Sequence, residues 1–169
     1  MAKRVSLREF QSHLAARLAG AGGRTAAGLL GFQAGSDFWL LSLADSGEIA
    51  SLPVLTVVPL TRTWFVGMAN IRGKLYSVTD FSAFLGREMT PQNASSRLLL
   101  IGARHGSNAA LLVTRLLGLR NIEDLTPVAA DAGAPGWASQ AYVDKEGRRW
   151  RFLDVRELLM DERFMDIGA

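Results

Sequence analysis

The stretch WFVGMANIRGKLYSVTDF, residues 64–81, combines two short strand patterns with a glycine-flanked turn and a helix start. Residues 66–70 and 74–78 are the expected strands, and the second run contains the aromatic and β-branched residues that strands favour. Asp80 follows as the cap of a short helix over residues 81–85, because its carboxylate can accept hydrogen bonds from the first free N–H groups. The stretch therefore predicts a hairpin that leads directly into a helix.

The glycines of this stretch superficially resemble a phosphate-binding loop. That motif needs four residues between its glycines and a Ser or Thr after its lysine. Here five residues separate Gly67 from Gly73, and Leu75 follows Lys74. A strand also follows the lysine, whereas a phosphate loop must open into a helix whose N–H groups hold the anion. Spacing and context thus both argue against a nucleotide site.

A different role fits the same residues. Gly67 and Gly73 allow the corner to turn tightly, or to adopt a positive φ, and allow another backbone to come close. Asn70 can satisfy local backbone groups. Arg72 offers five donors in a rigid fork, which suits a carboxylate on a partner's helix or across two strands. An acid of the same domain, such as Glu48, is an equally open partner, and both contacts can hold together.

Outside this stretch, short apolar runs alternate with turn residues. The further expected strands are residues 29–34, 37–43, 55–59, 98–101, 110–113, 116–119, 122–125, 138–143 and 150–153. Hairpin turns are expected at residues 35–36, 106–108 and 144–147, an interruption at 46–49, and loops at 87–96 and 126–136. Asp154, three residues before Glu157, begins a final helix. Many short strands with terminal helices predict a β-barrel architecture in two lobes.

The N-terminal residues predict an amphipathic helix. Ser6 stands three residues before Glu9, which is the spacing of a capping box, and residues 20–23 are rich in glycine and end the helix. Its apolar stripe consists of Leu7, Phe10, Leu14 and Leu18. Such a helix packs back on its own domain, or it binds a partner or a second copy from a flexible linker.

Composition excludes several classes of function. The 169 residues contain no cysteine, which excludes disulfides, thiolate zinc sites and thiol nucleophiles. The two histidines, His13 and His105, belong to no metal-ligand pattern, and no nucleophile elbow is present. We therefore expect no catalytic residue, no metal and no cofactor. No run approaches the roughly 20 apolar residues that cross a membrane, so no direct membrane insertion is expected.

Nucleic-acid binding is the alternative from another functional class. Small β-barrels bind single strands with basic and aromatic side chains, and this chain has such a mixture near the central stretch. The residues concerned are Arg62, Arg72, Lys74, Trp64, Phe65 and Tyr76. The net charge of +3 is scattered among acids and forms no basic stripe, so no nucleic-acid partner is expected.

With these segments in place, the chain resembles the CheW-type coupling domains. Residues 64–81 resemble the family's sequence of a short helical turn, a glycine, an Asn-Leu-Arg-Gly corner, an apolar strand and an Asp that opens a helix. Gly47-Glu48-Ile49 resembles the family's Glu-Ile segment, and the later strands and closing helix match as well, so that the resemblance covers residues 28–162. The N-terminal extension and Phe84-Leu85-Gly86 resemble the PilI-like branch of type IV pilus (twitching) systems. Thr114-Arg115 departs from the acidic residue that the family often has there.

The resemblance implies a mainly β fold of two SH3-like five-stranded barrels with short helices and with N- and C-terminal helices. The expected domains are residues 1–26, a helix with a glycine-rich linker, and residues 27–165, two intertwined lobes. The implied function is a non-enzymatic adaptor between the cytoplasmic tip of a chemoreceptor and the regulatory domain of a CheA-type histidine kinase. It would be cytoplasmic, on membrane-bound receptor arrays, and could self-associate through its N-terminal helix. A flagellar chemotaxis CheW is the alternative within the family.

The resemblance also assigns roles to individual residues. Carried over by position, Glu48, Asn70 and Arg72 would lie at or near a receptor-facing groove, and Leu43 and Ile49 would supply apolar contacts there. The glycines at 67 and 73 would shape the corner.

Overall fold

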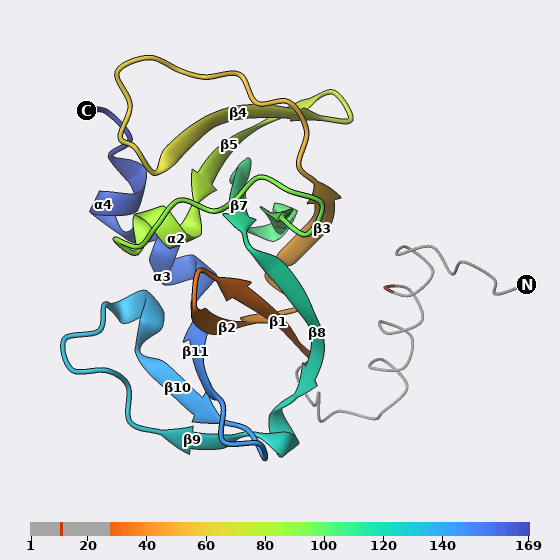
Figure 1. The fold of residues 1–169 in the computed structure, drawn as a ribbon, viewed down its shortest axis with the longest axis vertical. Coiled ribbons are helices and arrows are strands. Elements are labelled where there is room, and N and C mark those ends of the chain that lie inside the picture. The colour runs from red at the N-terminus through yellow and green to blue at the C-terminus, as the bar shows by residue number, and fades with distance from the viewer. Residues whose placement is uncertain (1–10, 12–27) are drawn as a thin grey trace, which may run out of the picture.

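The computed structural model describes residue 11 and residues 28–169 of the chain (Figure 1). The helix and linker predicted for residues 1–26 lie outside this described part, apart from that one residue, and stay a prediction. Within it, no helix is long and apolar enough to span a bilayer.

The described chain forms two β-sheets, which confirms the mainly β prediction (Figure 1). The six-stranded sheet has the order β8 (Arg115–Asn121), β1 (Gly28–Ala34), β2 (Asp37–Ser42), β11 (Arg149–Leu153), β10 (Gln140–Val143), β9 (Thr126–Val128). The five-stranded sheet has the order β3 (Ser46–Ser51), β6 (Arg97–Ile101), β7 (Ala109–Val113), β5 (Lys74–Asp80), β4 (Phe65–Ile71). The short helices are α2 (Phe81–Phe84), α3 (Val155–Met160) and α4 (Glu162–Met165), with 3-10 turns η1 (Ala103–His105), η2 (Ile122–Asp124) and η3 (Gly136–Ala138). The resemblance implied two five-stranded barrels; one of the two sheets has five strands as expected, and the other has six.

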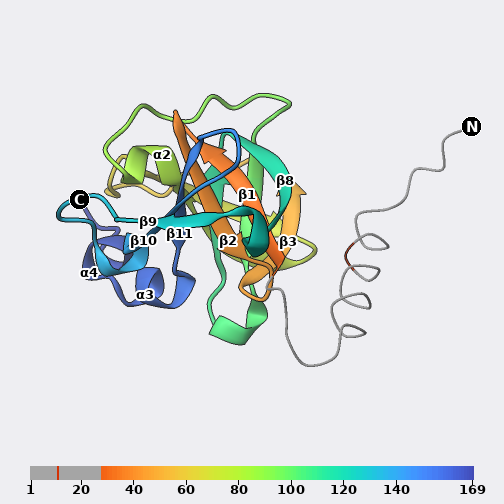
Figure 2. The same ribbon diagram turned by 90° about the horizontal axis from the view of Figure 1, so that it is seen from below.

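The chain passes from one sheet to the other and back. β1 and β2 begin the six-stranded sheet, β3 to β7 build the other, and β8 to β11 return to complete the first (Figures 1 and 2). Only Thr114 separates β7 from β8. Its N–H donates to the Gln33 carbonyl oxygen at 2.9 Å, and its Oγ1 accepts from the Gly35 N–H at 2.9 Å. The passage between the sheets is therefore fixed to the β1–β2 hairpin.

Tertiary pairing overrides two sequence-based predictions between β2 and β4. Residues 46–49 were expected to interrupt the strands, yet they belong to β3, where Ile49 pairs with Leu99 of the buried strand β6. Residues 55–59 were expected to be a strand, but they form only an isolated bridge, Thr56 with Met68. A partner strand can hold residues of low β propensity, whereas an apolar run beside prolines gains no ladder of its own.

Smaller corrections concern the segments next to β4 and β9. The helical turn that the resemblance implied ahead of Gly67 is one hydrogen-bonded turn, from the Phe65 N–H to the Arg62 carbonyl oxygen, after which β4 begins. Of the strand predicted over residues 122–125, three residues form η2. The loop predicted over residues 126–136 contains β9, an edge strand whose Pro127 needs no outward N–H donor.

A cluster rich in aromatic residues, the central cluster, lies where the sheets and the short helices meet. Its buried aromatic members are Phe32, Trp39, Trp64, Phe65, Phe81, Phe84, Trp137 and Phe164. Seven of them come from the two sheets and from α2, α4 and η3, and Trp64 immediately precedes β4. Each sheet also has a smaller cluster of its own, around Leu98 and Leu112 in one and around Leu40 and Trp150 in the other. The lobes are thus joined by a shared core.

Asp80 links three elements, more than a helix cap requires. Its carboxylate accepts from the Ala83 N–H at 3.2 Å, which confirms the predicted cap of α2. It also accepts from the N–H and the Oγ1 of Thr90, each at 2.7 Å. Asp80 is fully buried, so this one carboxylate ties the surface loop after α2 back to β5.

Candidate partner-binding site

The β4–β5 hairpin ends in a two-residue turn that only certain backbones can make. Ile71 pairs with Lys74, and the residues between them, Arg72 and Gly73, have φ values of 54° and 81°. Two successive positive φ values are typical of the type I′ turn, whose twist matches that of a hairpin. The Gly73 N–H donates to Asn70 Oδ1 at 3.0 Å. Asn70 therefore supports the turn locally, as its position predicted.

Gly67 serves a different purpose from Gly73. A Cβ at Gly67 would lie 2.4 Å from the Thr56 carbonyl oxygen, and its φ is 137°. Thr56 and Met68 exchange two backbone hydrogen bonds of 2.8 Å, which hold the segment before β4 against the strand. At Gly73 a Cβ would meet nothing within 4 Å. Close backbone approach thus requires the first glycine, and positive φ alone favours the second.

Arg72 is paired with an acid of its own domain. Its guanidinium lies 2.8 Å from Glu48 Oε1, and the side chains are 59% and 38% exposed. Glu48 lies on the edge strand β3, and Arg72 lies on the turn that follows β4, the other edge strand. The ion pair therefore links the two edges of the five-stranded sheet. An exposed pair of this kind contributes at most about 1 kcal/mol to stability. The internal pairing is confirmed, and contact with a partner stays a prediction.

The predicted site residues divide into two groups. Glu48, Asn70 and Arg72 gather at the surface around the hairpin turn. Leu43 and Ile49 are only partly exposed and pack against the central cluster. Their side chains can thus contact a partner only through the fraction of their surface left uncovered.

Sequence reasoning missed a row of exposed aliphatic residues. Val54, Val57 and Leu60 are 95%, 77% and 85% exposed, in the segment wrongly predicted to contain a strand. Leu75 of β5, opposite Asn70, is 58% exposed. The available signal was the pair of prolines at positions 53 and 59, which argue against a sheet position and leave the aliphatic residues without a core to join.

His105, the histidine within residues 28–169, makes a structural contact. His105 Nε2 lies 2.8 Å from Asp45 Oδ1, so this side chain fastens η1 to the turn between β2 and β3. In residues 28–169, no three His, Cys, Asp or Glu side chains are grouped as a metal site requires. His13 lies outside the described residues.

Known proteins are similar to this chain in sequence, and a solved structure shares its fold. The model of the CheW-like domain matches residues 28–163. The chain is 27% identical over 149 residues to Protein PilI of Pseudomonas aeruginosa, covering 83% of this chain and 79% of that protein. It is 28% identical over 109 residues to Chemotaxis protein CheW of Thermotoga maritima, covering 62% and 69% respectively. The solved structure of the scaffolding protein TtCheW from Thermoanaerobacter tengcongensis has the same fold, with a TM-score of 0.65 and 17% identity over 76% of this chain and 88% of that one.

Proposed function

Because the chain belongs to the CheW-like domain family, we propose that it is a non-enzymatic adaptor that couples a chemoreceptor to a CheA-type histidine kinase. The family match over residues 28–163 is the observation that carries this proposal. The adaptor's role is positional: it holds the kinase in register with the receptors, so that receptor signals become changes in kinase activity. The proposed working domain is residues 27–165, and the helix and linker predicted for residues 1–26 would be available for self-association.

We assign the adaptor to a system that controls type IV pili and twitching motility. The similarity to PilI extends over 83% of the chain, whereas that to the Thermotoga CheW extends over 62%. Thr114 and Arg115, which depart from the general family pattern, both serve the β1–β2 hairpin, since Arg115 Nε donates to Gln33 Oε1 at 2.6 Å. A flagellar chemotaxis role is the second candidate, favoured by the CheW match.

The Arg72–Glu48 surface is the proposed receptor-facing contact. The ion pair engages one terminal nitrogen of Arg72, so the other N–H groups of its fork are available to a carboxylate of a receptor helix. Asn70 fixes the turn that presents this guanidinium. The exposed edges of Leu43 and Ile49 add apolar contact. In this role the protein works in the cytoplasm, on membrane-bound receptor arrays.

Co-elution with the regulatory domain of the CheA-type kinase from the same organism tests the coupling role. The full chain and residues 24–169 are run in parallel on a sizing column, and comparison of the two complexes reports whether the N-terminal segment takes part. A stable complex is expected with the full chain. A folded chain that forms no complex at low salt would reject the adaptor function, and a steep salt-dependent affinity for RNA or DNA would then favour the nucleic-acid alternative.

Arg72→Ala tests the assigned surface. The variant is expected to melt as cooperatively as the original chain, because an exposed ion pair contributes little stability, while its coupling to receptor or kinase weakens. Arg104→Gln is the matched control, since Arg104 is another exposed arginine with an acidic neighbour, Asp45. Loss of cooperative melting in Arg72→Ala would show that the arginine is structural.

A further inference from the structure

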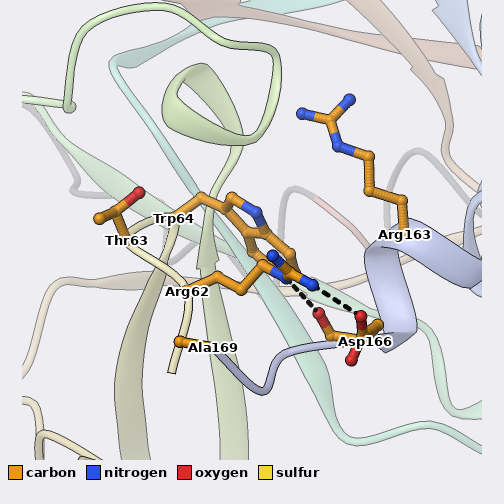
Figure 3. Close-up of a pocket in the computed structure, with 6 residues that line it drawn as sticks. All are labelled: Arg62, Thr63, Trp64, Arg163, Asp166 and Ala169. Atoms are coloured by element: carbon orange, nitrogen blue, oxygen red, sulfur yellow. Dashed lines mark hydrogen bonds and ion pairs between the residues drawn. The ribbon is translucent and has the colours of Figure 1, made fainter. Parts of the chain in front are cut away.

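A cavity of about 570 Å³ opens where the segment before β4 meets the residues after α4 (Figure 3). It is lined by Arg62, Thr63, Trp64, Arg163, Asp166 and Ala169. Trp64 is 6% exposed, and its ring is stacked on that of Phe164, with 8° between the planes. The cavity therefore has a rigid aromatic wall.

The two arginines of this cavity differ in their partners. Arg62 donates to Asp166 twice, from a terminal nitrogen to Oδ2 at 2.8 Å and from Nε to the carbonyl oxygen at 3.1 Å. Arg163 donates to the Phe84 carbonyl oxygen at 2.6 Å, and its guanidinium lies 4.8 Å from the centre of the Phe84 ring. Within residues 28–169 it forms no ion pair. Figure 3 shows Arg62 reaching Asp166 while Arg163 extends away from that pair. The cavity thus carries one positive charge that is held in place and that forms no ion pair within the described residues.

Leu60 is bonded through its backbone to the cavity residue Ala169, and its own backbone has a conformation that a leucine rarely adopts. Its φ is 59°, in the left-handed region, and 85% of its surface is exposed. The Ala169 N–H donates to the Leu60 carbonyl oxygen at 3.0 Å, and the Arg62 N–H donates to that of Ile167 at 2.8 Å. The turn is therefore locked to the cavity wall, and it presents an aliphatic side chain to solvent. Val57, 77% exposed, lies three residues earlier.

We propose that Leu60, Arg62 and Arg163, together the Leu60 surface, bind a partner segment that carries an acidic side chain beside an aliphatic one. The carboxylate pairs with Arg163, whose charge has no acid of the described chain to meet, and the aliphatic side chain covers Leu60. The inference rests on the proposed function in one respect, because it gives the adaptor a second contact surface besides the Arg72–Glu48 pair.

Selection from a random library of peptides of about twelve residues on the full chain tests this inference without a known partner. The selected peptides are expected to combine Asp or Glu with a nearby Leu, Ile or Val. Their affinities are then measured by fluorescence anisotropy on three variants. Arg163→Gln should weaken binding about tenfold or more, the loss expected for a charge-assisted hydrogen bond. Arg104→Gln, the control, should leave it unchanged.

The Leu60→Gly variant tests whether the Leu60 side chain contacts the peptide, without disturbing the fold. Glycine accepts the positive φ without strain, so this variant should melt at the same or a higher temperature while peptide binding falls. Selected peptides without acids, affinities unaffected by Arg163→Gln, or no selected peptide at all would overturn the proposal. A dimer detected by sedimentation that dissociates in the Leu60→Gly variant would also overturn the proposal, because the surface would then bind a second copy of the chain. The kinase co-elution experiment is independent, so failure of either idea is visible without the other.

Discussion

At the scale of single residues, Gly67 and Gly73 of the β4–β5 hairpin are expected to differ in how much stability an alanine substitution removes. Gly67→Ala should lower the free energy of unfolding by more than about 3 kcal/mol, because its Cβ would overlap the Thr56 carbonyl oxygen and its φ is positive. Gly73→Ala should cost only about 1 kcal/mol, since its Cβ would be unobstructed. Urea unfolding of both variants measures the difference. Equal losses would show that the segment before β4 moves aside freely.

The turn residue Arg72 gives a second prediction at this scale. Arg72→Gly and Arg72→Ala both remove the ion pair to Glu48, but only glycine adopts a φ of 54° without strain. The glycine variant should therefore be more stable than the alanine variant by about 1 kcal/mol. Thermal unfolding of the two proteins checks this, and identical midpoints would indicate that the turn relaxes. Both variants should be equally weak in receptor coupling.

At the scale of elements, Asp80 connects β5, α2 and the loop that follows. Asp80→Ala leaves the buried N–H and hydroxyl of Thr90 without an acceptor and uncaps α2, so a loss of about 3 kcal/mol or more is expected. Asp154→Ala removes only the cap of α3 and should cost about 1 kcal/mol. Chemical unfolding distinguishes the two. Similar losses would mean that water replaces Asp80 at Thr90.

The β10–β11 turn predicts a dependence of stability on pH. Burial opposes ionisation of Asp144, but hydrogen bonds from Trp150 Nε1 and from the N–H groups of Arg148 and Glu146 prevail and hold the pKa of this carboxyl below its usual range. A lowered folded-state pKa stabilises the protein above the unfolded pKa of about 3.9, and this contribution is lost as the pH falls through the folded pKa. Melting temperatures should therefore fall below about pH 4.

Asp144→Asn should lower the melting temperature at neutral pH and flatten the fall in acid, because the charge that these donors stabilise is absent. Glu146→Gln, on the same turn, should keep the full acid dependence. Asp131 adds to the same effect, since a hydrogen bond from Arg151 above all lowers the pKa of its carboxyl. An unchanged profile for Asp144→Asn would assign the acid loss to other groups.

Elements were predictable where local chemistry decides them. The β1–β2 turn at Gly35, the cap of α3 at Asp154 and both strands of the β4–β5 hairpin follow from neighbouring residues alone. The strand β3 did not, because Ser46 and Gly47 have low β propensity, and the strand is held by the pairing of Ser46 and of Ile49 to Ser51 with β6.

The candidate site was predictable only in part. The link from Arg72 to Glu48 was foreseen as one of two alternatives. The exposure of Leu60 and the freedom of Arg163 from acids depend on how the chain after α4 folds back on the segment before β4, and no local pattern reports such contacts.

At the scale of the whole molecule, the shared core predicts one cooperative unfolding transition. The central cluster joins both sheets, and β2 pairs with β11 across the length of the chain. Fluorotryptophan labelling gives separate fluorine NMR signals for the indoles, including Trp64 before β4 and Trp150 in β11. All should change at the same urea concentration. A lower midpoint for one of these two tryptophans would show that one lobe unfolds while the other persists.

The return of the chain to its first sheet also sets the order in which a newly made molecule can fold. β1 and β2 leave the ribosome first, yet the strand beside β2, β11, ends at Leu153, more than a hundred residues later. At translation speeds of roughly 5–20 residues per second, the nascent hairpin waits about 5–20 s with Trp39 and Leu41 uncovered. The five-stranded sheet, contained between Ser46 and Val113, is complete in that interval. Synthesis thus favours early assembly of the five-stranded lobe. Until β11 is made, the apolar strands β1 and β2 must be kept from contact with neighbouring nascent chains.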